Sequence, residues 1–120
     1  MTTGSNSLAD RLSRYREIKI SVTGRQSGRT ISNPVWFVFD NGKLYLLPVQ
    51  GTDTQWYKNV LQNPAMKIGV RDTEAEVSAT PIEDAKKISS VIEKFREKYG
   101  AQDVKKYYSK FDAAVVIEMR

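Results

Sequence analysis

The sequence contains no cysteine and no histidine in 120 residues. The absence of cysteine excludes disulfides, thiolate nucleophiles and cysteine-based metal sites. The absence of histidine removes the side chain that most often serves as a general base near neutral pH. This excludes Ser–His and Cys–His hydrolysis and the common zinc sites, and we expect no metal site. If the protein is an enzyme, we expect a bound cofactor to perform the difficult chemical step while the protein orients it.

Long apolar runs are also absent. No segment approaches the roughly 18 consecutive apolar residues of a membrane span, so we expect no integral membrane segment. The N-terminal stretch lacks the apolar region of a secretory signal, and we therefore expect a cytoplasmic protein. The length and the balance of 40% hydrophobic and 28% charged residues predict one folded domain over residues 1–120, with the small polar residues 1–7 disordered.

Acidic residues are the scarcer charge. Lysine and arginine number 19 against 14 aspartates and glutamates, which gives a net charge of +5. This excess suits an anionic partner such as a phosphorylated cofactor, nucleic acid or an acidic lipid surface, and it equally suits a surface that only keeps the protein soluble. The tract KKYYSK at residues 105–110 has the composition of a nucleic-acid contact, but such short tracts are common on helices. We expect no nucleic-acid partner.

Hydrophobic periodicity predicts six strands and four short helices. The strands fall at residues 18–22, 30–40, 43–49, 65–71, 74–82 and 112–119, and the helices at residues 8–14, 52–62, 83–99 and 101–111. Many strands with few helices do not make a parallel βαβ sheet. Hairpin connections instead predict an antiparallel sheet curled into a small barrel, with helices at its sides.

Two local features refine this pattern. Pro34 lies inside a strand and donates no ladder hydrogen bond, so it predicts an edge, a bulge or the true start of pairing. The second helix is expected to begin at a cap formed by Thr52 or Asp53. Its apolar face is expected to include Leu61.

The first loop, TGRQSGR at residues 23–29, carries two glycines and two arginines. A chain that only reverses direction needs no guanidinium groups at the bend. Glycines allow successive backbone N–H groups to point toward one anion, and Arg25 and Arg29 add forked, charge-assisted hydrogen bonds. We interpret the loop as an anion site; the alternative is a solvated hairpin loop.

Four segments taken together resemble one known family: TGRQSGR, NPVWFVFDNGKLYLL, the helix WYKNVLQNP after Gly51, and the terminal VVIEM. They are similar to the deazaflavin-dependent nitroreductase and quinone reductase family, whose members use coenzyme F420 and are split β-barrels related to pyridoxamine-phosphate oxidases. The similarity spans residues 18–119. It implies a mainly β fold with flanking helices, a split antiparallel β-barrel. It also implies an oxidoreductase that moves hydride from the reduced deazaflavin to a quinone-like, nitroaromatic or other conjugated acceptor.

The resemblance also implies a site. The anionic coenzyme would contact Arg25, Gln26, Ser27, Gly28, Pro34, Leu47, Pro48, Val49, Gln50, Trp56 and Asn59. A flat conjugated substrate would meet Trp36, Tyr99 and Tyr107. The residues alone favour a partial core role for Trp56. Asn59 is a poor helix former, so it fits a bond to a neighbouring loop as well as a ligand contact.

Two positions depart from the family pattern. Gln26 and Gln50 stand where better-known members carry lysine, which removes two cations from the coenzyme site. FMN is therefore an alternative coenzyme. A non-catalytic module that binds a flavin, lipid or tetrapyrrole on the same barrel is an alternative function. Relatives of this barrel often pair to complete a groove, which favours a homodimer.

Overall fold

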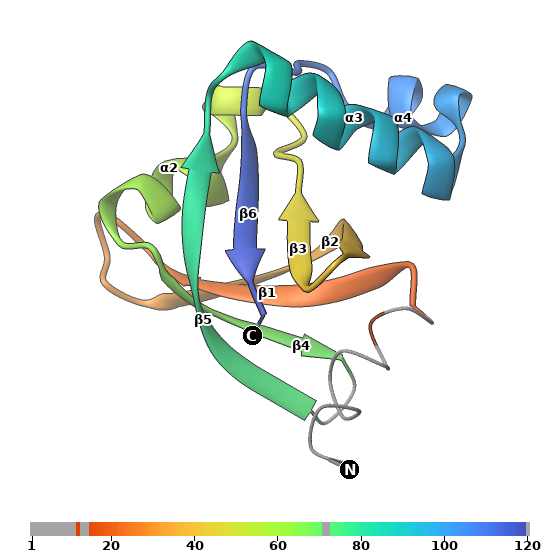
Figure 1. Ribbon diagram of the computed structural model, residues 1–120. Helices are drawn as coiled ribbons and strands as arrows, with labels where there is room; N and C mark the ends of the chain where they lie inside the picture. Colours follow the sequence, from red (N-terminus) through yellow and green to blue (C-terminus); the bar gives the residue numbers. More distant parts are fainter. Residues whose placement is uncertain (1–11, 13–14, 71–72, 120) are drawn as a thin grey trace, which may run out of the picture.

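The computed structural model describes Leu12 and residues 15–70 and 73–119 (Figure 1). The disorder predicted for residues 1–7 and most of the helix predicted at residues 8–14 lie outside the described residues. The elements, in chain order, are strands β1 (Glu17–Thr23), β2 (Thr30–Asp40) and β3 (Lys43–Leu46), the 3-10 helix η2 (Gly51–Asp53), helix α2 (Gln55–Gln62), strands β4 (Ala65–Val70) and β5 (Thr73–Ile82), helices α3 (Ala85–Tyr99) and α4 (Ala101–Tyr107), and strand β6 (Ala114–Glu118).

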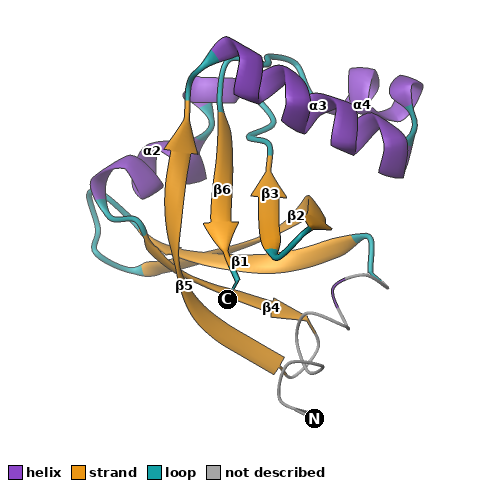
Figure 2. Cartoon of the chain, in the orientation of Figure 1, coloured by secondary structure: helices purple, strands orange, loops and turns teal. Residues whose placement is uncertain are grey.

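These six strands close into an antiparallel barrel in the order β1-β2-β3-β6-β5-β4. β2 pairs with β1 through residues 30–36 and with β3 through residues 37–40. β5 likewise pairs with β4 through residues 73–78 and with β6 through residues 79–82. Two sheets therefore share two long strands, and α3 and α4 form a layer along one end of the barrel (Figure 2). The predicted split antiparallel β-barrel with flanking helices is confirmed.

The apolar faces of these elements fill two clusters. The first occupies the barrel interior and includes Trp56 and Tyr57 from α2. The second lies under the helical layer, where the apolar stripe of α3 and α4 packs against β-strand residues such as Val38. The stripe consists of Ile88, Val91, Phe95, Tyr99, Val104 and Tyr108. Its spacing of three and four residues within α3 is what holds that helix flat on the barrel.

Pro34 lies on an unpaired edge, which is one of the three positions predicted for it. The Gly24 N–H donates to the Arg29 carbonyl (2.8 Å), so this pair is hydrogen-bonded in the antiparallel ladder. Hydrogen-bonded and non-hydrogen-bonded pairs alternate, which makes the Lys19–Pro34 pair a non-hydrogen-bonded one. The nitrogen of Pro34 therefore faces away from β1, toward a side where, among the described residues, no strand pairs with this part of β2. The missing N–H costs no ladder bond there.

Four expectations about the helices and strands are wrong. α2 begins at Gln55 with Thr54 as its N-cap, because the N–H and hydroxyl of Thr52 both bond the carboxylate of Asp112 (2.8 Å each). Leu61 is 49% exposed, because it lies about 100° around the helix from Val60 on the buried face. The third strand ends at Leu46 rather than residue 49, where its pairing with β6 stops. The last helix ends at Tyr107 rather than residue 111, because the chain is extended at Tyr108 and the Ser109 N–H donates to the Val49 carbonyl.

Candidate functional site

A groove of about 290 Å³ lies between the β1–β2 loop and α2. Its walls come from the loop, the start of β2 and α2: Gly24, Arg25, Gln26, Ser27, Ile31, Asn33, Gln55, Trp56 and Asn59. Five of the residues assigned to the coenzyme from the sequence therefore meet in one place, namely Arg25, Gln26, Ser27, Trp56 and Asn59.

Gly28 shapes this loop without lining the groove. Its φ of +72° lies in the left-handed region that favours glycine. The Gly28 N–H donates to the Gly24 carbonyl (2.9 Å), and the Gly24 N–H donates to the Arg29 carbonyl (2.8 Å). The turn is thus closed by its own backbone, and that closure directs the intervening residues toward α2.

Arg25 is held by neutral groups on α2. Its Nη1 donates to Asn59 Oδ1 (2.8 Å) and its Nη2 donates to Gln55 Oε1 (2.8 Å). Neither acceptor carries a charge, and the described part of the chain provides no carboxylate that pairs with Arg25. The guanidinium is therefore oriented at the groove wall while its positive charge stays uncompensated, which is the electrostatic condition for binding an anion.

The loop has fewer free backbone N–H groups than the anion site predicted from the sequence would offer. The Arg25 N–H donates to Asn59 Oδ1 (3.1 Å), and the Arg29 N–H donates to Ser27 Oγ (3.1 Å). Among the described residues, the N–H groups of Gln26 and Ser27 have no acceptor and are available to a ligand. The side chain of Arg29 is exposed and does not line the groove, so one guanidinium rather than two lies at its wall.

Asn59 is the buried partner of this loop. Its side chain is 3% exposed, and its single oxygen accepts both the main-chain N–H and the guanidinium of Arg25. The sequence left open whether this mid-helix asparagine bonds a loop or a ligand. The loop bond is present, and Asn59 acts as the positioning residue for Arg25.

Four other residues assigned to the coenzyme, at positions 47–50, lie elsewhere. Leu47 is 2% exposed and packs in the second core cluster, and Pro48 is buried as well. The Val49 carbonyl accepts the Ser109 N–H (2.9 Å), and Gln50 forms an isolated bridge with Lys110. None of these four residues lines the groove, and the C-terminal segment covers their backbone.

The three residues assigned to the substrate do come together. Trp36 is sandwiched between Tyr99 (ring centroids 4.2 Å apart, 8° between planes) and Tyr107 (4.4 Å, 26°). Both faces of Trp36 are therefore covered by rings. Tyr99 is buried, whereas Tyr107 is 40% exposed and is the outer ring of the stack. Tyr108, its neighbour in sequence, is buried and meets Trp36 edge-on.

Tyr99 and Lys98 connect α3 to Phe37, the residue of β2 at which pairing with β1 ends and pairing with β3 begins. The Tyr99 hydroxyl accepts the Phe37 N–H (3.0 Å) and lies within donating distance of the Arg16 carbonyl (2.7 Å), and burial raises the pKa of Tyr99 to about 12. Lys98 Nζ lies 3.6 Å from the centroid of the Phe37 ring and donates to the Phe37 carbonyl (2.9 Å). Burial, with the nearby charge of Arg16, lowers the pKa of Lys98 to about 8.

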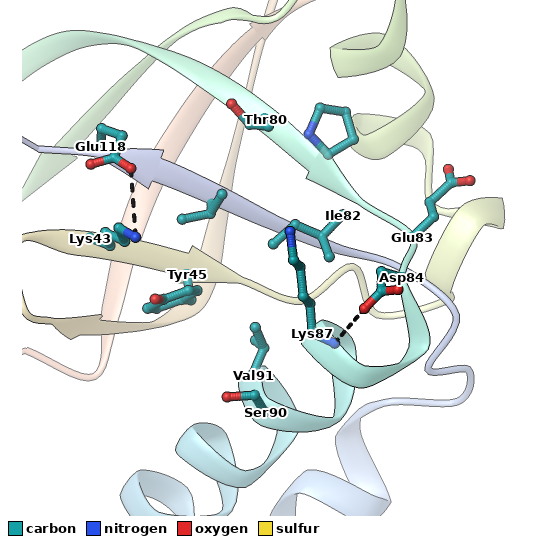
Figure 3. A pocket seen from close by; sticks show the side chains of 12 residues that line it. Lys43, Tyr45, Thr80, Ile82, Glu83, Asp84, Lys87, Ser90, Val91 and Glu118 are labelled. Atoms are coloured by element: carbon teal, nitrogen blue, oxygen red, sulfur yellow. Dashed lines mark hydrogen bonds and ion pairs between the residues drawn. The ribbon is translucent and has the colours of Figure 1, made fainter.

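A second hollow, of about 420 Å³, lies between α3 and the outer face of β3, β5 and β6 (Figure 3). The side chain of Lys87 extends from the first turn of α3 into it. The Lys43–Glu118 ion pair (3.8 Å) borders the hollow at one end, and Asp84, the N-cap of α3, borders it at the other. No residue assigned from the sequence lines this hollow, so it is separate from the loop groove.

Four groove residues were not assigned from the sequence, namely Gly24, Gln55, Ile31 and Asn33. Gln55 carried a signal, because it lies four residues before Asn59 and so on the same face of a helix. Ile31 and Asn33 lie two residues apart on one strand and share a face, but nothing in the sequence indicated that this face meets α2.

These features define a class of protein first, namely split antiparallel barrels of the flavin-reductase-like type. Solved structures with this fold include an F420-H2 dependent reductase, FDR-A, which is 21% identical with a TM-score of 0.66 and coverage of 86% of this chain and 94% of that one. They also include a putative pyridoxamine 5'-phosphate oxidase from Listeria innocua, with 15% identity, a TM-score of 0.65 and 92% of each chain covered. A third is HutZ, the heme storage protein from Vibrio cholerae, with 15% identity, a TM-score of 0.69 and coverage of 92% and 87%. The fold expected from the sequence resemblance is thereby confirmed.

The family follows from the sequence itself. The model of the family described as "Uncharacterized protein conserved in bacteria (DUF2255)" matches residues 9–119, and the chain belongs to this family. No curated protein matches the chain. Within residues 15–70 and 73–119, no helix is both long and apolar enough to cross a membrane. In the same residues, no three acidic side chains gather in a way that could hold a metal ion.

Proposed function

We propose that the chain binds an anionic redox coenzyme at the groove beside α2 and donates hydride from it to a flat conjugated acceptor. Coenzyme F420 is the first candidate and FMN the alternative. The observation that supports this proposal is the state of Arg25, a guanidinium oriented by Asn59 and Gln55 and left without a counter-ion in the described part of the chain. The fold shared with an F420-H2 dependent reductase supports it as well.

Each groove residue has a task in this proposal. Arg25 binds the phosphate or carboxylates of the coenzyme tail, and the N–H groups of Gln26 and Ser27 add two donors. Trp56 provides an apolar wall. When bound, the coenzyme supplies the hydride from its own ring, so a chain without histidine needs no general base for that step. On the substrate side, Tyr107 presents the exposed ring against which a flat acceptor would stack.

The test is fluorescence titration of the protein with F420 and, separately, with FMN. Arg25→Ala is expected to weaken binding of the preferred coenzyme about tenfold to hundredfold, because it removes a charge-assisted contact. Arg29→Ala removes the same charge from the same loop but lies outside the groove, so we expect less than about a threefold effect from it. Binding that survives Arg25→Ala, or that falls equally in both variants, would contradict the assignment of the groove.

A second function, a non-catalytic carrier on the same barrel, is favoured by one observation. Both faces of Trp36 are covered by tyrosine rings, so a substrate has no open stacking position on the tryptophan itself. The ligand would be a flavin, a lipid or a tetrapyrrole. Mass spectrometry of what co-purifies with the chain, followed by a turnover assay with reduced F420 and a nitroaromatic or quinone acceptor, separates the carrier from the reductase.

A further inference from the structure

The net charge of this protein is confined to one layer. Residues 85–110 span α3, α4 and the segment that follows, and they contain eight basic and three acidic residues. That leaves 11 of the 19 basic residues and 11 of the 14 acidic residues in the rest of the chain, which is therefore neutral overall. The whole charge of +5 thus falls within residues 85–110, directly after the acidic pair Glu83 and Asp84, of which Asp84 caps α3.

Most of this charge is not neutralised locally. Lys94 pairs with Asp40, Arg96 with Glu93, and Lys110 with Asp53. The other five basic residues of the layer make no ion pair with any described residue: Lys86, Lys87, Lys98, Lys105 and Lys106. All but Lys98 are exposed, and only two acidic residues of the layer, Glu97 and Asp103, are likewise without an ion-pair partner in that part of the chain. An excess of exposed ammonium groups remains.

α4 is the most exposed part of this layer. Val104 is its only buried residue, although the helix runs from Ala101 to Tyr107. It ends with Lys105, Lys106 and the 40% exposed ring of Tyr107, at the side of the molecule away from β4 and the lower part of β5 (Figure 1). Two lysines beside an exposed tyrosine combine attraction to anionic headgroups with an amphipathic ring suited to the membrane–water interface.

We propose that the helical layer formed by α3 and α4 docks on the surface of an anionic lipid bilayer, with Lys105 and Lys106 at the headgroups and Tyr107 at the interface. The lysines alone would suit a nucleic acid as well, but the exposed ring of Tyr107 favours the bilayer, because tyrosine side chains are enriched at the membrane–water interface. Tyr107 is also the outer ring on Trp36, so docking brings the aromatic stack to the lipid surface. The inference does not depend on the identity of the coenzyme.

The test is co-sedimentation of the full chain with vesicles of phosphatidylcholine alone and of phosphatidylcholine mixed with phosphatidylglycerol. Binding is expected only to the anionic vesicles and is expected to disappear in high salt. The double variant Lys105→Gln/Lys106→Gln should lower the affinity about tenfold to thirtyfold, because each substitution removes the attraction of one lysine to the anionic surface. Tyr107→Ser should weaken binding further without changing its salt dependence.

The matched control is Lys58→Gln/Lys67→Gln, which lowers the net charge equally but on α2 and β4. It should leave vesicle binding within about twofold of the wild type, and circular dichroism should confirm that all variants are folded. Equal loss in the control would assign the effect to net charge and overturn the proposal. So would binding to neutral vesicles, no binding to vesicles at all, or tighter binding to RNA or DNA than to anionic vesicles at the same salt.

Discussion

Lys98 carries an ammonium group into a half-buried position where, in the described part of the chain, no carboxylate pairs with it. Its neighbours are the ring and carbonyl of Phe37 and the guanidinium of Arg16, and burial lowers its pKa from 10.5 to about 8. The unfolded chain therefore binds a proton at this side chain more tightly than the folded chain does. Between about pH 8 and pH 10 the folded state holds fewer protons, so the free energy of unfolding should rise with pH.

We expect Lys98→Met to stabilise the protein at pH 7 and to flatten this rise, because methionine keeps the contact with Phe37 and carries no charge. The gain should be on the order of 1 kcal/mol, since partial exposure and the lost bond to the Phe37 carbonyl offset part of the effect. Urea unfolding at pH 7, 8 and 9.5 measures both quantities. Lys86→Met, on the exposed face of the same helix, is the control and should show neither change. A wild-type stability that falls between pH 8 and 9.5 would contradict the assignment.

At this scale the sequence predicted part of the set of residues that gather, but not what they do to one another. Arg25 and Asn59 were both assigned to the coenzyme, and they do line one groove. That Asn59 holds Arg25, with Gln55 as the second acceptor, depends on how a loop meets a helix more than 25 residues away along the chain. Hydrophobic periodicity contains no information about such a contact, because it reports burial rather than partners.

At the scale of elements, η2 is fastened to the C-terminal segment. The carboxylate of Asp112 accepts the N–H and hydroxyl of Thr52, and Lys110 pairs with Asp53 (3.1 Å). Gly51 begins η2 with φ +57°, and a Cβ at this position would lie 2.0 Å from Asp112 Oδ1. The position therefore requires glycine for two reasons, its backbone angle and the closeness of the carboxylate.

Gly51→Ala should lower the free energy of unfolding by about 2 kcal/mol more than Gly28→Ala. Gly28 also has a positive φ, of +72°, but an added Cβ there meets nothing within 4 Å. The difference between the two variants in urea unfolding isolates the clash with Asp112 from the strain of the backbone. Equal losses would mean that the carboxylate moves aside without cost.

Element types and their order were predictable because they follow from local periodicity, although β3 and α4 end earlier than it indicated. The start of α2 was not predictable. Threonine commonly caps helices, but the hydroxyl of Thr52 donates to the carboxylate of Asp112, which lies 60 residues later in the chain. A tertiary hydrogen bond therefore overrode a local capping preference.

At the scale of the molecule, the open side of β2 is a strand edge that Pro34 protects. Unpaired edges invite pairing with a second chain, and proline on the edge prevents it because it offers no N–H. We expect Pro34→Thr to increase self-association with concentration, measured by light scattering, relative to the wild type. The homodimer expected from the family resemblance stays a prediction, and the wild-type measurement gives its answer in the same experiment. A Pro34→Thr variant that behaves as the wild type at every concentration would show that this edge is protected by other means.

The sequence by itself determined a small antiparallel barrel with helices at its sides, the position of the glycine–arginine loop and the exclusion of histidine- and cysteine-based chemistry. These follow from composition, periodicity and turn residues, which act over a few neighbours in the chain. Only the tertiary structure decided that Arg25 faces α2 while Arg29 does not, and that tyrosines cover Trp36 on both sides. Each of these depends on side chains that come from distant segments and meet in the folded protein. The hydrophobic pattern of one segment does not indicate which other segment it will contact.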